Sequence, residues 1–142
     1  MTIAIRHIRI LDGLGHRIER GTLLIEGTRI QAVGPEQDVR LPKGAQRIDG
    51  RRLTVLPGLI DCHVHFCLGA EADVVAAVEG EPSSLTLLKA AELARRTLHA
   101  GFTTVRDVGF RDHAVFALKQ AIESALTPGP RILAAGLAIC MP

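Results

Sequence analysis

The sequence predicts an α/β fold in two parts: a small β unit in residues 1–55, followed by alternating strands and helices in residues 56–142. Two observations support this division. Short apolar runs separated by turn dipeptides fill the first part. In the second part, apolar residues recur at helical spacing between β-branched runs. A chain of 142 residues, of which 47% are hydrophobic, is long enough to bury a core.

The first part reads as a mostly antiparallel β unit. Its first strand carries alternating isoleucines whose phase shifts at Arg6-His7: Ile3, Ile5, Ile8 and Ile10. Dipeptides such as Asp12-Gly13 and Gly34-Pro35 tolerate the backbone angles of tight turns. Further strands are therefore expected over residues 22–25 and 29–33, and a last strand over residues 47–48 and 53–55, around Asp49-Gly50.

The second part reads as strand, helix, strand, helix, strand. A helix capped by Ser83 or Ser84 is expected to run to about Ala100, where Gly101 ends it. A strand over residues 102–106, a helix capped by Asp112 and a strand over residues 131–135 follow. This order implies parallel strands joined by crossover helices. Residues 71–79 are compatible with a short helix or with an active-site loop.

Composition excludes several classes of function. The longest uncharged apolar stretch, residues 132–141, is far shorter than the roughly 18–20 residues of a membrane span, and no signal peptide opens the chain, so we expect a cytoplasmic protein. A net charge of +2 and the absence of Trp and Tyr argue against a nucleic-acid surface. Cys62, Cys67 and Cys140 form no CxxC pair, which argues against a disulfide framework.

The segment Asp61-Cys62-His63-Val64-His65 carries the strongest chemical signal. In a strand, side chains two residues apart point to the same face, so His63 and His65 could share one metal ion. Asp61 would share that face and could orient an imidazole or lie among the groups that surround the metal ligands. The spacing alone is weak evidence, because structural or solvent-exposed histidines show it too.

Longer motifs make the pattern specific. The run from Leu56 to His65 resembles the PGxIDxHxH signature that opens the barrel of the amidohydrolase superfamily, and residues 99–109 resemble its second-strand motif G(F/Y)TTVRDxG. Residues 3–55 resemble the β part before the barrel, and residues 128–136 resemble the entry to the third strand. Together these segments cover nearly the whole chain. Within the superfamily, we suggest the imidazolonepropionase-related and Xaa-Pro dipeptidase-like members as relatives.

This resemblance implies a small N-terminal β-sandwich-like unit followed by the first three strands of a truncated (β/α)8 TIM barrel. It also implies a hydrolase of carbon–nitrogen bonds in small-molecule or dipeptide substrates. Such enzymes use one or two divalent metals, usually zinc, to activate water. His63 and His65 would be the first two metal ligands.

The resemblance leaves the site incomplete. The remaining ligands of relatives come from later strands, and a full barrel takes about 250 residues. Lys89 and Lys119 fall on predicted helices, and His99 and His113 match no ligand position. We therefore expect a truncated chain with no complete catalytic set and weak or no activity. The alternative is a non-catalytic fragment that self-associates through exposed barrel edges or needs a partner chain.

Two further sets of polar residues carry predictions: the end of the second barrel strand and a group of four acids. Arg106 and Asp107 end the second barrel strand, where they would lie in the substrate pocket or around the metal, or else form a structural pair. The acids Glu71, Asp73, Glu79 and Glu81 are expected to form a solvated face rather than a site.

Overall fold

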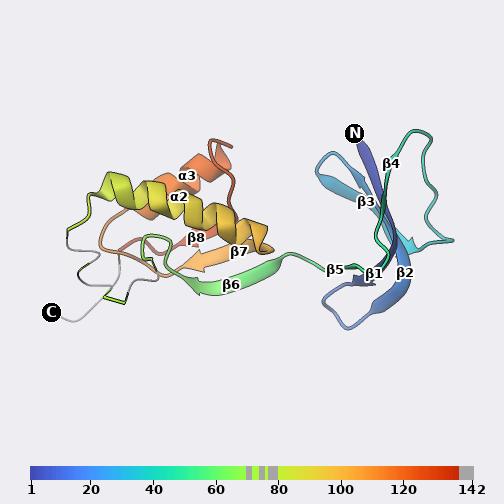
Figure 1. Cartoon of the computed structure of the whole chain (residues 1–142), viewed down its shortest axis with the longest axis horizontal. Coiled ribbons are helices and arrows are strands. Elements are labelled where there is room, and N and C mark those ends of the chain that lie inside the picture. Colours follow the sequence, from blue (N-terminus) through green and yellow to red (C-terminus); the bar gives the residue numbers. More distant parts are fainter. Residues whose placement is uncertain (70–71, 74–75, 77–79, 138–142) are drawn as a thin grey trace. The chain divides into compact units, whose positions relative to one another are not determined.

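The computed structural model describes residues 1–69, 72–73, 76 and 80–137. The chain forms two compact units, Met1–Pro57 and Gly58–Pro142, and each is described by itself (Figure 1). The division lies close to the point at which the sequence pattern changes from strands alone to alternating strands and helices.

The first unit is a single five-stranded sheet. Its strands are β1 (Thr2–Leu11), β2 (Arg17–Glu26), β3 (Arg29–Pro35), β4 (Gln46–Asp49) and β5 (Thr54–Val55). The order is β3-β2-β1-β4, and β5 also pairs with β1. Residues 1–57 are all described, and their strands form this one sheet rather than the sandwich-like layers expected from the resemblance.

The sheet is mixed rather than mostly antiparallel. β1 pairs antiparallel with β2, and β2 with β3, as hairpin connections require. β4 and β5 both run parallel to β1, because residues 36–45 carry the chain back before β4 begins. Between them, Gly50 lies against β1, with its amide donating to the Arg6 carbonyl at 2.8 Å. This close approach of Gly50 to β1 falls between β4 and β5, which were predicted from the sequence as one strand.

The change of phase predicted at Arg6-His7 is confirmed. The register between β1 and β2 shifts between Arg6 and Ile8, and His7 takes a left-handed φ of 58°. The extra residue of such a bulge leaves the regular alternation. Ala4, Ile8 and Ile10 of this strand are buried.

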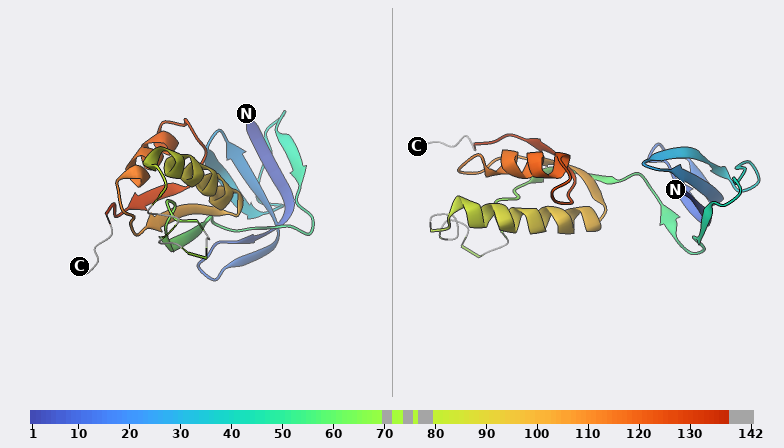
Figure 2. Two further views of the ribbon diagram at one scale, coloured as in Figure 1. Left: turned by 60° about the vertical axis from the view of Figure 1, so that its left-hand side comes forward. Right: turned by 90° about the horizontal axis from the view of Figure 1, so that it is seen from above.

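The second unit has three parallel strands and two described helices. They are β6 (Leu59–Val64), α2 (Ser83–His99), β7 (Phe102–Asp107), α3 (Ala114–Glu123) and β8 (Arg131–Ala134). The strand order is β6-β7-β8. The two helices lie side by side over one face of this sheet (Figure 2). The predicted alternation of strands and helices is confirmed, and it gives the parallel arrangement that crossover helices imply.

The core of this unit lies between the helices and the sheet. Val105 of β7 and Ile132 of β8 contact a cluster of buried helix residues: Ala90, Ala94, Val115 and Leu118. The opposite face of the sheet keeps apolar side chains exposed, including Ile60 at 66% and Leu133 at 53%. In the described part of the chain, this sheet is therefore buried on one face only.

The helix ends differ slightly from the prediction. α2 has Pro82 at its N-cap rather than Ser83 or Ser84, and no side chain caps it there. The Ser83 hydroxyl instead donates to the Asp112 carboxylate at 2.6 Å. α3 has His113 at its N-cap, although Asp112 still accepts the amide of Ala114 at 2.8 Å. The stop at Gly101 is confirmed, with a φ of 97°.

Neither described helix is long and apolar enough to cross a membrane. Most of the segment predicted as a short helix or a loop, residues 71–79, lies outside the described residues.

Candidate metal centre

His63 and His65 lie together at the carboxyl end of β6. His63 belongs to the strand, whereas His65 is the first residue after it. Their ring centroids are 5.3 Å apart, with an angle of 67° between the ring planes. The pairing with β7 is irregular between Asp61 and Val64, which interrupts the strict alternation of side chains expected in an ideal strand. The two imidazoles are neighbours through this irregular strand end rather than through an ideal strand.

The ring of His65 is held by a backbone carbonyl. Its Nδ1 lies 2.7 Å from the carbonyl oxygen of Gly109. Because a carbonyl oxygen only accepts, Nδ1 must carry the proton and donate it. In the neutral ring, this leaves the lone pair on Nε2, the atom that would bind a metal.

Asp61 contacts the backbone rather than an imidazole. Its Oδ1 accepts the amide of His63 at 2.9 Å. The carboxylate therefore fixes the turn of the chain at His63 and does not orient a ring, as the sequence analysis had suggested it could.

Arg106 and Asp107 follow each other at the end of β7 but have different surroundings. The exposed Arg106 donates from Nε to the Cys62 carbonyl at 2.8 Å. The Asp107 side chain is buried, and its two oxygens accept the amides of Phe66 at 2.8 Å and Gly109 at 3.1 Å. Each side chain hydrogen-bonds to backbone groups, so these contacts are not those of the structural Arg–Asp pair that was the alternative prediction.

The two described cysteines differ in their exposure. Cys62 is exposed and Cys67 is buried, and they form no disulfide with each other. Burial, followed by the charges of Asp107 and Asp112, raises the pKa of the Cys67 thiol to about 12. A thiol ligand binds metal as the thiolate. Without a metal, the Cys67 thiol therefore stays protonated near neutral pH.

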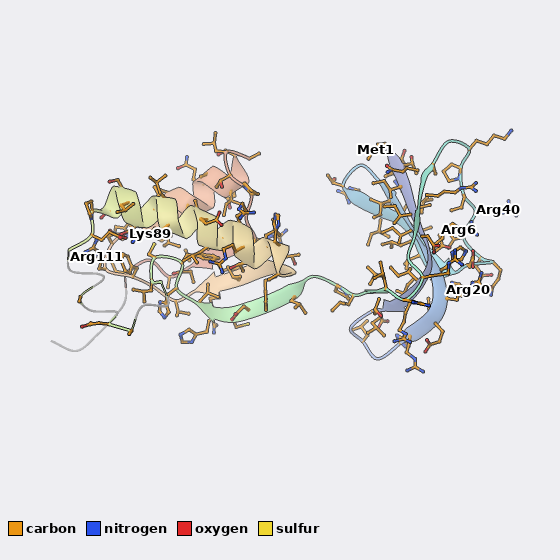
Figure 3. The ribbon with its side chains drawn as sticks, in the orientation of Figure 1. Met1, Arg6, Arg20, Arg40, Lys89 and Arg111 are labelled. Atoms are coloured by element: carbon orange, nitrogen blue, oxygen red, sulfur yellow. The ribbon has the colours of Figure 1, made fainter. Side chains whose placement is uncertain are left out.

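Glu81, before α2, and Arg111, before α3, connect the segments that precede the two helices. Glu81 accepts a hydrogen bond from Thr86 at 2.8 Å and also pairs with Lys89, and Arg111 donates to the Glu81 carbonyl. Lys89 and Arg111 lie at the same end of α2 in Figure 3. The Lys89 and Thr86 contacts lower the pKa of the Glu81 carboxyl. Glu81, which was predicted to belong to a solvated face, is therefore engaged in contacts with α2 and with the segment before α3. Glu71 and Glu79 lie outside the described residues.

The remaining candidates lie on helices. Lys119 pairs weakly with Glu123 at 4.0 Å, along α3. His99 is the last residue of α2 and is exposed, and the ring of His113 lies 5.7 Å from that of Phe116. Among the described residues, no three His, Cys, Asp or Glu side chains gather so that they could hold a metal ion. In the part of the chain that the structure describes, His63 and His65 are therefore a candidate pair of ligands and not a complete metal site.

Gly109 was not among the residues that the sequence predicted for the site. It carries no side-chain chemistry, and its part in the site lies in its carbonyl and amide groups. The second-strand motif over residues 99–109 ends on this glycine, which takes a φ of 120°. That angle is rarely adopted by residues with a side chain, so the glycine itself was the available signal.

Comparison with known proteins gives a consistent result. The model of the amidohydrolase family matches residues 54–141. The chain is 31% identical over 105 residues to the imidazolonepropionase of Chloroflexus aggregans, which covers 64% of the chain and 25% of that protein. It is 41% identical over 66 residues to a dihydroorotase of Lactococcus lactis subsp. lactis, covering 46% and 15%.

Solved structures agree. The chain is similar to a Xaa-Pro dipeptidase with methionine bound in its active site, with a TM-score of 0.84 and 33% identity, covering 98% of this chain and 34% of that one. It is also similar to a prolidase complexed with N-methylphosphonate-L-proline, with a TM-score of 0.78 and 35% identity, covering 96% and 32%. The chain thus spans about a third of these structures, and a quarter or less of the two curated relatives above.

Proposed function

Because the chain belongs to the amidohydrolase family, we propose that it contributes the first two metal ligands, His63 and His65, to a site that hydrolyses carbon–nitrogen bonds. Members of this family are metal-dependent and hydrolyse amide-type bonds. The observation that carries the proposal is the pair of imidazoles at the end of β6, with His65 already held in the tautomer that frees Nε2.

The donor set suits a divalent metal such as zinc. Two imidazole nitrogens are typical zinc ligands, and a catalytic zinc usually has three protein ligands and one open position. A metal ion bound there would supply Lewis acidity and activate water at neutral pH. The part of this chain would be to hold the two rings: Gly109 through the ring of His65, and Asp61 through the backbone of His63.

The substrate class follows from the relatives. We propose a small molecule with an amide or cyclic amide bond, or a dipeptide, since the structures named above are of a Xaa-Pro dipeptidase and a prolidase. The exposed guanidinium of Arg106, one residue from the end of β7, is a candidate for contacting a carboxylate of such a substrate.

Zinc binding tests the proposal. Titration of the 142-residue chain with Zn²⁺ is expected to show binding that weakens at least about tenfold in His63→Ala and in His65→Ala. His99→Ala and His113→Ala are matched controls that should bind zinc as the wild type does. Equal affinity in all five proteins would contradict the assignment of the ligands.

Hydrolysis is tested separately. Zinc-loaded chain is offered a panel of Xaa-Pro dipeptides and cyclic amides, and turnover is expected to depend on zinc and to disappear in His63→Ala. Turnover that survives both zinc removal and His63→Ala would contradict the proposed chemistry.

A second candidate function is that the chain is non-catalytic alone and needs a partner chain to complete the site. The lack of a third ligand among the described residues favours it, as does the exposed apolar face around Ile60 and Leu133. Concentration-dependent association without turnover is the expected result for this alternative. A monomer with zinc-dependent turnover would exclude it.

A further inference from the structure

A buried carboxylate at the end of β7 is bonded to the residue after His65 and to the glycine that accepts from the His65 ring. Asp107 is 1% exposed, and each of its oxygens accepts one backbone amide. One amide belongs to Phe66, the residue after His65. The other belongs to Gly109, whose carbonyl accepts the Nδ1 proton of His65.

We infer that Asp107 is a positioning residue for His65, acting on its backbone through Phe66 and on its ring through Gly109. This inference rests on the proposed metal-binding function of His65. It assigns Asp107 neither to the metal nor to the substrate, because both of its oxygens already accept hydrogen bonds within the protein.

The geometry gives each link a reason. A buried carboxylate is costly unless its oxygens are hydrogen-bonded, and charge-assisted bonds to amides are stronger than neutral ones. Gly109 can turn its amide toward Asp107 and its carbonyl toward His65 with its φ of 120°, which side chains disfavour. The ring of His65 therefore depends on a glycine backbone that Asp107 holds.

Neighbouring backbone contacts make this end of the sheet stiff. The amide of Val108 donates to the Val64 carbonyl at 3.0 Å, and the amide of Ala135 donates to the Asp107 carbonyl at 2.9 Å. Asp107 is thus bonded through its own carbonyl as well as through its side chain, and it links the ends of β6, β7 and β8. A ligand held by such a frame loses little freedom when it binds metal.

The test uses the full chain and the variant Asp107→Asn. The carboxamide keeps the shape but can accept well with one atom only, so one of the two amides loses its acceptor. The primary readout is the ring tautomer of His65 in the metal-free chain, observed by ¹⁵N NMR. The wild type is expected to show the Nδ1-protonated ring, and Asp107→Asn a mixture of tautomers.

Two further readouts accompany the tautomer. Hydrogen exchange at the amides of Phe66 and Gly109 is expected to accelerate in Asp107→Asn. Zinc affinity is expected to fall roughly tenfold, as for other groups that orient a metal ligand. The matched control is Asp112→Asn, which removes a carboxylate that bonds Ser83 and Ala114 instead. It should leave the His65 tautomer unchanged even where it lowers stability.

The outcomes separate the two proposals. An unchanged tautomer and unchanged zinc affinity in folded Asp107→Asn would overturn the positioning role. A wild-type chain that binds no zinc through His63 and His65 would overturn the proposed function, while the tautomer and exchange readouts still decide the role of Asp107. If Asp107→Asn does not fold, Gly109→Ala tests the same relay, and an Nε2-protonated His65 in the wild type overturns it directly.

Discussion

The two units use their charged side chains differently. In Met1–Pro57, charges mostly meet charges: Glu36 accepts from Arg20 at 2.7 Å and also pairs with Arg6 and His7. In Gly58–Pro142, the site carboxylates Asp61 and Asp107 meet backbone amides instead. Exposed ion pairs hold a surface together weakly and are screened by salt. Carboxylate–amide contacts, exposed at Asp61 and buried at Asp107, fix the path of the chain at the candidate site.

The first way to sharpen this comparison is to damage the core that supports the site. Leu118 of α3 is fully buried against the sheet. Leu118→Ala is expected to lower the free energy of unfolding by about 2–5 kcal/mol, from lost burial and a cavity. Urea denaturation measures this. The matched control is Leu88→Ala, at a position 70% exposed in α2, where the change should stay within about 0.5 kcal/mol.

A second substitution tests close packing in the first unit. A Cβ at Gly50 would lie 2.8 Å from the Cβ of Ile8 and 3.0 Å from the Arg6 carbonyl oxygen. Gly50→Ala is expected to cost about 1–3 kcal/mol, because β4 and β5 must move away from β1. Gly34→Ala is the control, since its Cβ would meet only Val39 at 3.7 Å. Equal stability of the two variants would show that the sheet yields easily at Gly50.

Thiol reactivity tests the burial beside the site. In a Cys140→Ser background, Cys62 should react quickly with a thiol reagent at pH 8, and Cys67 only on unfolding. The pKa of Cys67 is raised from 9.0 to about 12, so its contribution to stability is complete below pH 9 and is lost as the pH rises toward 12. Rapid labelling of Cys67 in the folded chain would contradict the burial.

The smallest effect is expected from the ion pairs. Arg20 and Arg6 lower the pKa of the Glu36 carboxyl below its usual 4.5, so its contribution is present above that pH and is lost as the pH falls. Glu36→Gln should therefore flatten the acid side of a plot of Tm against pH, with less effect in high salt. If Glu36→Gln lowered stability as much as Leu118→Ala does, and independently of salt, the proposed difference between the two units would be wrong.

Much of this could be predicted from the sequence. The isoleucine pattern located β1 and its bulge, and the helical spacing of apolar residues located α2 and α3 within a few residues. The alternation of strands and helices gave the parallel order. The expected sandwich-like arrangement is not confirmed for residues 1–57, whose strands form one sheet, because residue spacing locates strands but does not decide whether they share one sheet. Neither did it reveal that β4 and β5 run parallel to β1.

At the candidate site, the sequence by itself determined the chemical groups. The spacing of His63 and His65 and the motifs around them identified the family, and the comparisons agree. Only the tertiary structure decided how those groups are held. The bonds from Phe66 to Asp107 and from His65 to Gly109 join residues more than 40 positions apart, and the local bond from Gly109 to Asp107 connects them. All three bonds involve backbone atoms of the kind that every residue carries, so residue types alone did not identify the partners, although the glycine at position 109 was a signal.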